Sequence, residues 1–331
     1  MNLQNRIQLL QRLGEYLLDN GEEWALVKKR ASTQNSWFIP EFIELAVRNI
    51  VTDFLQKEKL EHWAAHYHLD DNISGKNIGI VMAGNIPLVG FHDLLSVFIS
   101  GHRQTVKLST KDDILLKHLV EKLAELEPVV KERIHFANML KGCDGYIATG
   151  SNNSARYFEQ YFSKYPNIIR CNRTSVAVLS GQETEEELGS LSDDIHQYFG
   201  LGCRNVTRIL VPEGYDFVPL LKAFDRYKYF ADHHKFKNNF DYQFSILLMN
   251  NIYYMTNGTT LLVESNDNFT AISRVNYSYY KPGENVIEKL KGNADIQCIS
   301  GRNLVPFGQA QKPQLMDYAD GVDTMQFLLS L

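Results

Sequence analysis

The chain has 331 residues, of which 44% are hydrophobic and 22% are charged, a composition typical of a globular protein with a sizeable core. The formal net charge of -5 argues against the concentrated basic surface that nucleic-acid binding needs, and no apolar run reaches the roughly 18 to 20 residues of a membrane span. The N-terminal stretch lacks the apolar core of a signal peptide, so we expect a cytoplasmic protein.

The N-terminal region is expected to be helical. Leucines recur at helical spacing within residues 3–20, and Pro40 suits the first turn of a second helix over 40–58. The stretch RASTQNSW, residues 30–37, is expected to form the loop between them.

From residue 76 short apolar runs alternate with helical stretches. The helices are expected to begin near Pro87, at Asp112 or Asp113, and at about residue 153. This alternation predicts an α/β fold with a mostly parallel sheet that helices cover on both faces. The predicted strands are 77–83, 104–109, 145–150, 167–172 and 175–180.

The polar run from residue 181 predicts a long helix that leads into Cys203. A strand is expected over 206–211, then helices at about 216–230 and 233–249, and shorter strands beyond residue 252. We expect a domain boundary near Gly181. It divides the chain into an N-terminal helical segment (1–75), a first domain (76–181) and a second domain with a C-terminal return segment (182–331).

The four cysteines are far apart and form no C-x-x-C pair, so the sequence suggests neither a metal site nor a disulfide framework. In a reducing cytoplasm each is either core filling or chemistry. They are Cys143, Cys171, Cys203 and Cys298.

The stretch AGNIPLVGFHD, residues 83–93, follows a predicted strand and opens a helix. In parallel sheets, ligands bind at this edge. The Asn85 amide can donate a hydrogen bond to a developing oxyanion, or it can simply cap the helix.

Two further stretches occupy equivalent positions. In TGSNNSARYF, Gly150 and Ser151 lie where a strand passes into a helix, whose N–H groups can hold a pyrophosphate, although the segment is not a G-x-G-x-x-G fingerprint. Lys107 ends the strand in TVKLST and can reach a ribose or a phosphate. The alternatives are an ordinary Gly-Ser turn and a solvated lysine.

Cys203 lies in QYFGLGCRNVTRILV, between glycines and a run of strand formers. Backbone N–H groups at such a turn can lower a thiol pKa and bind an oxyanion. The alternative is a small buried side chain, which is what most free cysteines are.

Taken together and in order, these stretches resemble the aldehyde dehydrogenase superfamily. The closest likeness is to the LuxC-like fatty acyl-CoA reductases, which share wording similar to GNIPLVGFHD, FKNNFDYQ (236–243) and DGVDTMQFLL (320–329). The resemblance covers residues 75–331. It implies two domains, each with a mostly parallel sheet covered by helices, and an active site in the cleft between them.

The resemblance also implies roles for the residues. Cys203 is the expected nucleophile, with Asn85 and the Cys203 backbone N–H holding the oxyanion. Gly150 and Ser151 are expected at the pyrophosphate and Lys107 at the ribose of the cofactor, NADPH or NADH. Residues 76–181 then form the cofactor-binding domain and 182–331 the catalytic cysteine domain. No metal is implied.

The implied reaction is reduction of a fatty acyl-CoA to an aldehyde through an acyl-cysteine intermediate. Hydrolysing relatives carry a glutamate that activates water, whereas the matching segment here, PNIIRCNRTSVAV, has no acid, which favours the acylating direction. A carboxylate distant in sequence, such as Asp241 or Glu264, is the alternative base. Expected partners are acyl-CoA or another activated acyl donor, an acyl-activating enzyme and further copies of the chain, and neither nucleic acid nor a membrane span.

Two other functions remain open from sequence alone. One is an acyl-phosphate reductase of the same superfamily, and the other is a non-catalytic binding protein on this fold. The chain is also shorter than full-length relatives, so part of a substrate channel is not accounted for. The stretch 231–244, with His233 and Tyr242, can contact CoA phosphates or be a solvated helix. His92 and His102 are read as acid/base groups or structural histidines.

Overall fold

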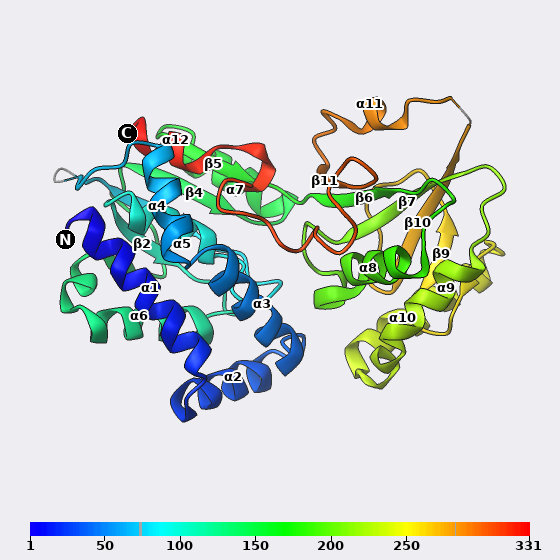
Figure 1. Ribbon diagram of the computed structural model, residues 1–331, viewed down its shortest axis with the longest axis horizontal. Coiled ribbons are helices and arrows are strands. Elements are labelled where there is room, and N and C mark those ends of the chain that lie inside the picture. The colour runs from blue at the N-terminus through cyan, green and yellow to red at the C-terminus, as the bar shows by residue number, and fades with distance from the viewer. Residues whose placement is uncertain (73–74, 282) are drawn as a thin grey trace. The chain divides into compact units, whose positions relative to one another are not determined.

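The computed structural model describes residues 1–72, 75–281 and 283–331, which form two compact units (Figure 1). The first unit is made of Met1–Asn172 and Pro313–Leu331, and the second of Arg173–Lys312. The change of unit therefore falls before the boundary expected near Gly181, and the C-terminal segment returns to the first unit.

Helices build the N-terminal part of the first unit. Helix α1 packs against α3, α4, α5 and α6 through its leucine face, as the spacing predicts. The expected loop 30–37 is wrong in its first half, because α2 continues through Gln34. Lys28 and Ala31 bury one side of this helix against the core, which the polar residues of RASTQ hide in the sequence. The helices are α1 (Leu3–Asp19), α2 (Glu22–Gln34), α3 (Pro40–Asp53) and α4 (Lys57–His66).

The first sheet has five parallel strands in the order β3-β2-β1-β4-β5. Strands β1, β2, β4 and β5 match the expected positions. The order reverses direction between β1 and β4, and right-handed crossovers then place α5 and α7 on opposite faces. The strands are β1 (Asn77–Val81), β2 (Arg103–Lys107), β3 (Ile134–Phe136), β4 (Gly145–Thr149) and β5 (Asn167–Arg170). The helices are α5 (Phe91–Ile99), α6 (Ile114–Leu126), the short 3-10 helix η1 (Pro128–Glu132) and α7 (Asn152–Phe162).

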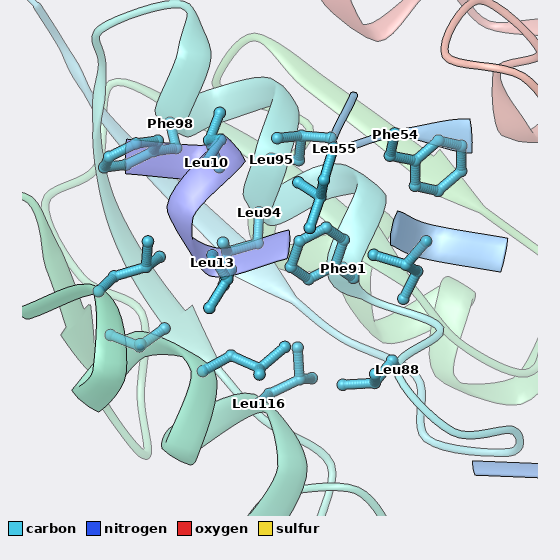
Figure 2. Close-up of a cluster of buried hydrophobic side chains, with 14 of the residues drawn as sticks. Leu10, Leu13, Phe54, Leu55, Leu88, Phe91, Leu94, Leu95, Phe98 and Leu116 are labelled. Carbon is cyan, nitrogen blue, oxygen red and sulfur yellow. The ribbon is translucent and has the colours of Figure 1, made fainter. Parts of the chain in front are cut away.

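The core of the first unit lies between α1, α5, α6 and the sheet. Figure 2 shows leucines of α1 and α6 beside the aromatic side chains of α5, with Leu88 at the edge of the cluster. Every residue of α5 except His92 is buried, so burial rather than polar capping defines this helix. Its N-cap is Gly90, whereas Pro87 lies in the preceding turn, and the expectation that Pro87 opens the helix is wrong.

A buried ion pair fixes the C-terminal segment of the first unit. Arg170 Nη1 at the end of β5 contacts both carboxylate oxygens of Asp93, at 2.8 and 2.6 Å, while Nη2 donates to Thr324 Oγ1 at 2.8 Å. Both charged side chains are almost fully buried. The segment contains the 3-10 helix η4 (Ala319–Gly321) and α12 (Thr324–Leu329), which packs on α5.

The second unit contains a six-stranded sheet in the order β11-β6-β7-β10-β9-β8. All pairings are parallel except β8 with β9. The strands are β6 (Thr174–Val178), β7 (Val206–Pro212), β8 (Met255–Thr256), β9 (Leu261–Glu264), β10 (Arg274–Tyr280) and β11 (Ile296–Gly301). The helices are α8 (Glu185–His196), α9 (Val218–Phe224), α10 (His234–Met249) and α11 (Val286–Leu290), with the 3-10 segments η2 (Gln197–Gly200) and η3 (Asp225–Asp232).

Strand β6 explains the shifted boundary. It belongs to the second sheet, between β11 and β7, although it follows β5 of the first sheet after three residues, Cys171 to Arg173. Both strands are short and rich in β-branched residues, so nothing local in the sequence assigns either to a sheet. Long-range pairing decides it.

In the described part of the chain, no helix combines the length and the apolar character needed to cross a bilayer.

We predict that Asp93→Asn destabilises the first unit by about 3–5 kcal/mol, because it leaves the buried Arg170 charge without compensation. The exposed pair Lys57–Glu61 supplies the control, and Lys57→Gln should cost less than about 1 kcal/mol. Denaturant unfolding followed by tryptophan fluorescence reports on this unit, since all three tryptophans, Trp24, Trp37 and Trp63, lie in it. Equal effects of the two substitutions would refute the role of the pair.

Candidate functional site

Four of the sequence-predicted residues come from loops or strand ends on one edge of the first sheet. Val81, the last residue of β1, is in register with Lys107 on one side and Ala148 on the other. The carboxyl ends of β1, β2 and β4 are therefore adjacent. The loop with Asn85 follows β1, and Gly150 and Ser151 follow β4. The strand order reverses between β1 and β4, and open parallel sheets bind ligands at such a point.

Asn85 is half-buried in a bend between β1 and α5, so it is not the cap of that helix. A Cβ on Gly84 would lie 2.7 Å from Ser109 Oγ, and one on Gly90 would lie 2.5 Å from Met82 Sδ. The loop backbone is thus packed closely at both ends. Asn85 lies on a segment with little room to move.

The Gly150–Ser151 turn has structural contacts of its own. Ser151 caps α7, accepting from Ser154 N at 3.3 Å, and the Gly150 N–H donates to Arg170 O at 3.2 Å. A Cβ on Gly150 would meet Phe158 and Ser154 at 2.9 Å, so packing already requires a glycine here. The first turn of α7 is exposed, and N–H groups of a first turn lack intrahelical acceptors. N–H groups at a helix N-terminus are the kind of group that binds an anion.

Lys107 is exposed at the end of β2. Its place beside β1 puts a cation on the same edge as the first turn of α7. These groups suit an anionic cofactor that lies along the edge.

Cys203 lies in the second unit, on a turn between α8 and β7, and it is half-buried. The chain reaches this turn through three consecutive left-handed residues, Tyr198, Phe199 and Gly200, with φ of 56°, 57° and 74°. Left-handed backbone is unfavourable for the two aromatic residues and needs compensation from the surrounding structure.

Asn205 supplies this compensation. Its side chain is fully buried, and Nδ2 donates to the carbonyl oxygens of Asp194, Ile195 and Gln197 at 3.1, 3.2 and 2.9 Å. Its Oδ1 accepts from Gly202 N at 2.8 Å, and its own N–H donates to Gly202 O at 3.1 Å. One side chain thus joins the end of α8 to both sides of the Cys203 turn.

The neighbouring strands hold the other side of this turn. The buried Ser175 Oγ in β6 donates to Cys203 O at 3.1 Å and also lies 3.1 Å from Cys298 Sγ. Thr174 Oγ1 donates to Asn205 O at 3.3 Å. Side chains of β6 therefore hold the backbone of the Cys203 turn.

Two buried titratable groups beside this turn were not anticipated. His196 is fully buried, with Nδ1 2.8 Å from Ser192 O and Nε2 2.8 Å from Thr260 Oγ1, and burial lowers its pKa to about 4. Asp194 accepts from the N–H groups of Gly308 and Ala310 at 2.8 and 3.0 Å, and burial raises its pKa to about 7. In the sequence, both residues are simply polar members of the acid-rich helix α8, which gives no sign that they are buried.

Several other predicted candidates have structural contacts. His92 Nε2 is 3.0 Å from Leu315 O and packs edge-on to Phe54, and His102 accepts from Lys76 N at 2.9 Å. Burial lowers the pKa of His102. These contacts agree with structural histidines.

In the stretch 231–244, His233 caps α10, Tyr242 is exposed, and Asp241 is paired with Lys237. Glu264, the other alternative base, is exposed at the end of β9. Among the described residues, no group of three or more His, Cys, Asp or Glu side chains is placed to hold a metal ion.

The segment PNIIRCNRTSVAV, which lacks a glutamate, includes β5. Arg170 at the end of β5 is paired with Asp93, whose two carboxylate oxygens both contact the guanidinium. Cys171 next to it is exposed. Asn85, Lys107, Gly150 and Ser151 belong to the first unit and Cys203 to the second.

Solved structures similar to this chain include several aldehyde dehydrogenases. Aldehyde dehydrogenase 21 from Physcomitrella patens, in complex with the reaction product succinate, matches 100% of this chain and 84% of its own length, with a TM-score of 0.69 and 13% identity. An NAD-dependent aldehyde dehydrogenase from Sinorhizobium meliloti matches 95% and 73%, with a TM-score of 0.67 and 12% identity. An NAD⁺ complex of an aldehyde dehydrogenase from Bacillus cereus matches 89% and 70%, with a TM-score of 0.64 and 13% identity.

Neither a protein-family model nor a curated protein sequence matches the chain. The fold is therefore established by structure: an aldehyde dehydrogenase-like α/β fold with parallel sheets covered by helices, as predicted. At this identity the likeness concerns the fold. The narrower resemblance to acyl-CoA reductases remains a prediction.

We predict that Asn205→Ala destabilises the second unit by about 3 kcal/mol, since it leaves several buried carbonyl groups and the Gly202 N–H without partners. Alkylation of Cys203 by iodoacetamide, followed by mass spectrometry, should become faster as its turn loosens. Asn250→Ala is the matched control, because the substitution removes only the exposed side-chain bond from Asn250 Nδ2 to Ile246 O and should cost less than about 1 kcal/mol. Unchanged stability and labelling in Asn205→Ala would contradict the role of this side chain.

Proposed function

We propose that the protein is an acyl-CoA reductase, which forms an aldehyde from a fatty acyl-CoA and a reduced nicotinamide cofactor. The observation that carries the proposal is the half-buried Cys203, held on a turn by the buried Asn205 and Ser175. A cysteine that merely fills the core needs no such support. The aldehyde dehydrogenase-like fold is compatible with aldehyde chemistry.

In this proposal the Cys203 thiolate attacks the thioester carbonyl of the acyl-CoA. The C–S bond to CoA breaks, the CoA thiolate leaves, and the acyl group is carried on Cys203. Rigid support of the turn favours this step, because a nucleophile held in a near-attack position avoids much of the entropic cost of a bimolecular reaction.

Asn85 is proposed to donate its amide N–H to the oxyanion of the tetrahedral intermediate, together with the Cys203 backbone N–H. The loss of one such donor typically costs about 10² to 10³ in kcat. The closely packed loop around Gly84 and Gly90 supports this role, since an oxyanion donor must be in place before the charge develops.

The edge of the first sheet fits a dinucleotide with its pyrophosphate at the first turn of α7 and its ribose near Lys107. When bound, the cofactor supplies the hydride that converts the acyl group to a thiohemiacetal on Cys203. Collapse of the thiohemiacetal releases the aldehyde and restores the thiol. We propose NADPH or NADH, and an acyl-activating partner enzyme as the source of the acyl donor.

The direction of the reaction is inferred from the missing glutamate. Deacylation by water needs a general base, and the matching segment contains arginines and a cysteine, with Asp93 engaged by Arg170. Asp241 is paired with Lys237. An acyl group on Cys203 is then removed by hydride or by the CoA thiolate.

We predict that the protein releases CoA and forms aldehyde when supplied with acyl-CoA and reduced cofactor. Acyl chains of two to sixteen carbons should be compared, because a channel can discriminate by about 0.8 kcal/mol per buried CH₂. Cys203→Ala should abolish turnover and leave cofactor binding intact, whereas Cys171→Ala, at an exposed thiol, should retain activity. Full activity of Cys203→Ala would refute the nucleophile, and activity with acyl phosphate in place of acyl-CoA would reassign the donor.

We further predict that aldehyde and oxidised cofactor yield acyl-CoA rapidly when CoA is present and yield free acid slowly when it is absent. A positioned base typically contributes about 10² to 10⁴ in rate, and hydrolysis should lack this factor. Both products are measured by chromatography. Rapid formation of acid without CoA would show that a base acts at Cys203 and that the direction is misassigned.

A further inference from the structure

Asp112 packs against the loop 82–90 that carries Asn85. Its Oδ2 accepts from Leu88 N at 2.6 Å, and its Cβ would be 3.2 Å from a Cβ on Gly84. Asp112 therefore packs close to the loop at Gly84, one residue before Asn85, and its carboxyl binds the loop at Leu88, three residues after Asn85.

The hydrogen bond to Asp112 holds a strained residue. Leu88 has a φ of 59°, which a leucine adopts only when its surroundings impose it. Its side chain is buried in the core beside α5 (Figure 2), and its carbonyl accepts from Phe91 N at 2.9 Å. Asp112 supplies the contact to the Leu88 N–H.

In the described part of the chain, Asp112 has no cationic partner. Its exposed fraction is 3%, and within the described residues its other oxygen, Oδ1, has no hydrogen-bond partner. The loop 82–90 contains no charged residue, Lys107 and Lys111 are exposed, and Asp113 adds a negative charge. At the end of α2, the Gln34 side chain donates to Thr110 O and Asp113 Oδ1. The next residue, Asn35, donates to Lys111 O. On α5, Asp93 is neutralised by Arg170.

We propose that Asp112 is a proton-sensitive positioning residue, whose neutral carboxyl closes the loop 82–90 and fixes the Asn85 amide. The proposal rests on the oxyanion role proposed for Asn85. It adds to that role, because the position of Asn85 then depends on the Asp112 carboxyl, which does not contact the substrate.

The pH dependence has a defined sign. Burial raises the pKa of Asp112 to about 7, well above its ordinary value of 3.8. Between about pH 4 and pH 7, Asp112 is therefore protonated when the loop is closed. When the loop is open and Asp112 is in water, its carboxyl is ionised over the same range. Closure is strongest below about pH 4, weakens by up to about tenfold per unit as the pH rises to 7, and is constant above 7.

Hydrogen exchange measured by mass spectrometry tests this on the intact protein. Between pH 5 and 7, protection of a peptide spanning 84–90, corrected for intrinsic exchange, should fall by up to about fifty-fold and then level off. A peptide from β4 should not follow it. Asp112→Asn, which keeps the acceptor and cannot ionise, should make the protection independent of pH, whereas Asp113→Asn should behave like the parent.

Kinetics test the positioning role. Asp112→Ala should lower kcat for acyl-CoA reduction at least tenfold, Asp112→Asn should restore it to within about twofold of the parent, and the alkylation rate of Cys203 should stay unchanged in both. The proposal is overturned if protection in the parent does not depend on pH, if β4 follows the same profile, or if Asn fails to rescue. The exchange of the parent decides even where Asp112→Ala does not fold. Absence of turnover in the parent, with the exchange profile present, would instead refute the proposed function.

Discussion

The turn that presents Cys203 depends on the side chain of Asn205. A chain that passes from α8 to β7 through two left-handed aromatic residues leaves the last carbonyl groups of the helix without their usual partners. Asn205 binds two of these carbonyl groups, those of Asp194 and Ile195, together with Gln197 O and the Gly202 N–H, and these bonds stabilise the strained path that ends at the cysteine. Ser175 and Thr174 connect the same turn to the sheet.

Each unit contains a buried carboxyl that holds backbone and has a pKa raised to about 7. Asp112 accepts from the Leu88 N–H in the loop with Asn85, and Asp194, in the helix that precedes the Cys203 turn, accepts from the N–H groups of Gly308 and Ala310. Within the described residues, neither carboxyl has a cationic partner at hydrogen-bond distance. Burying the charged form of such a group costs free energy, so the backbone contacts of each carboxyl depend on its protonation state.

Much of the fold could be predicted from the sequence, because apolar runs separated by helical stretches have a strong periodic signal. Strands β1, β2, β4, β5 and β7 and helices α7 and α10 lie where the pattern put them. The assignment of β6 to the second sheet could not be predicted, since sheet membership depends on pairing between distant residues. The polar half of α2 was hidden for a related reason: its burial comes from tertiary packing.

The candidate site was predictable only in part. Gly-rich turns and strand ends pointed to Asn85, Lys107, Gly150 and Ser151, and all four follow or end strands at one sheet edge. The supporting groups Asn205, Asp112 and Ser175 gave no comparable signal, because their importance lies in burial and in hydrogen bonds to backbone far away in the chain. For Gly150 the structure adds a packing requirement against Phe158 that the sequence did not reveal.

The central claim is that Cys203 carries the acyl group. The most direct measurement is mass spectrometry of the protein after incubation with a long-chain acyl-CoA and no reduced cofactor, followed by digestion. We expect a hydroxylamine-sensitive acyl group on the peptide that contains Cys203, which is lost on addition of reduced cofactor and is absent from Cys203→Ala. An unmodified Cys203, or an acyl group that forms equally on Cys143, Cys171 or Cys298, would contradict it.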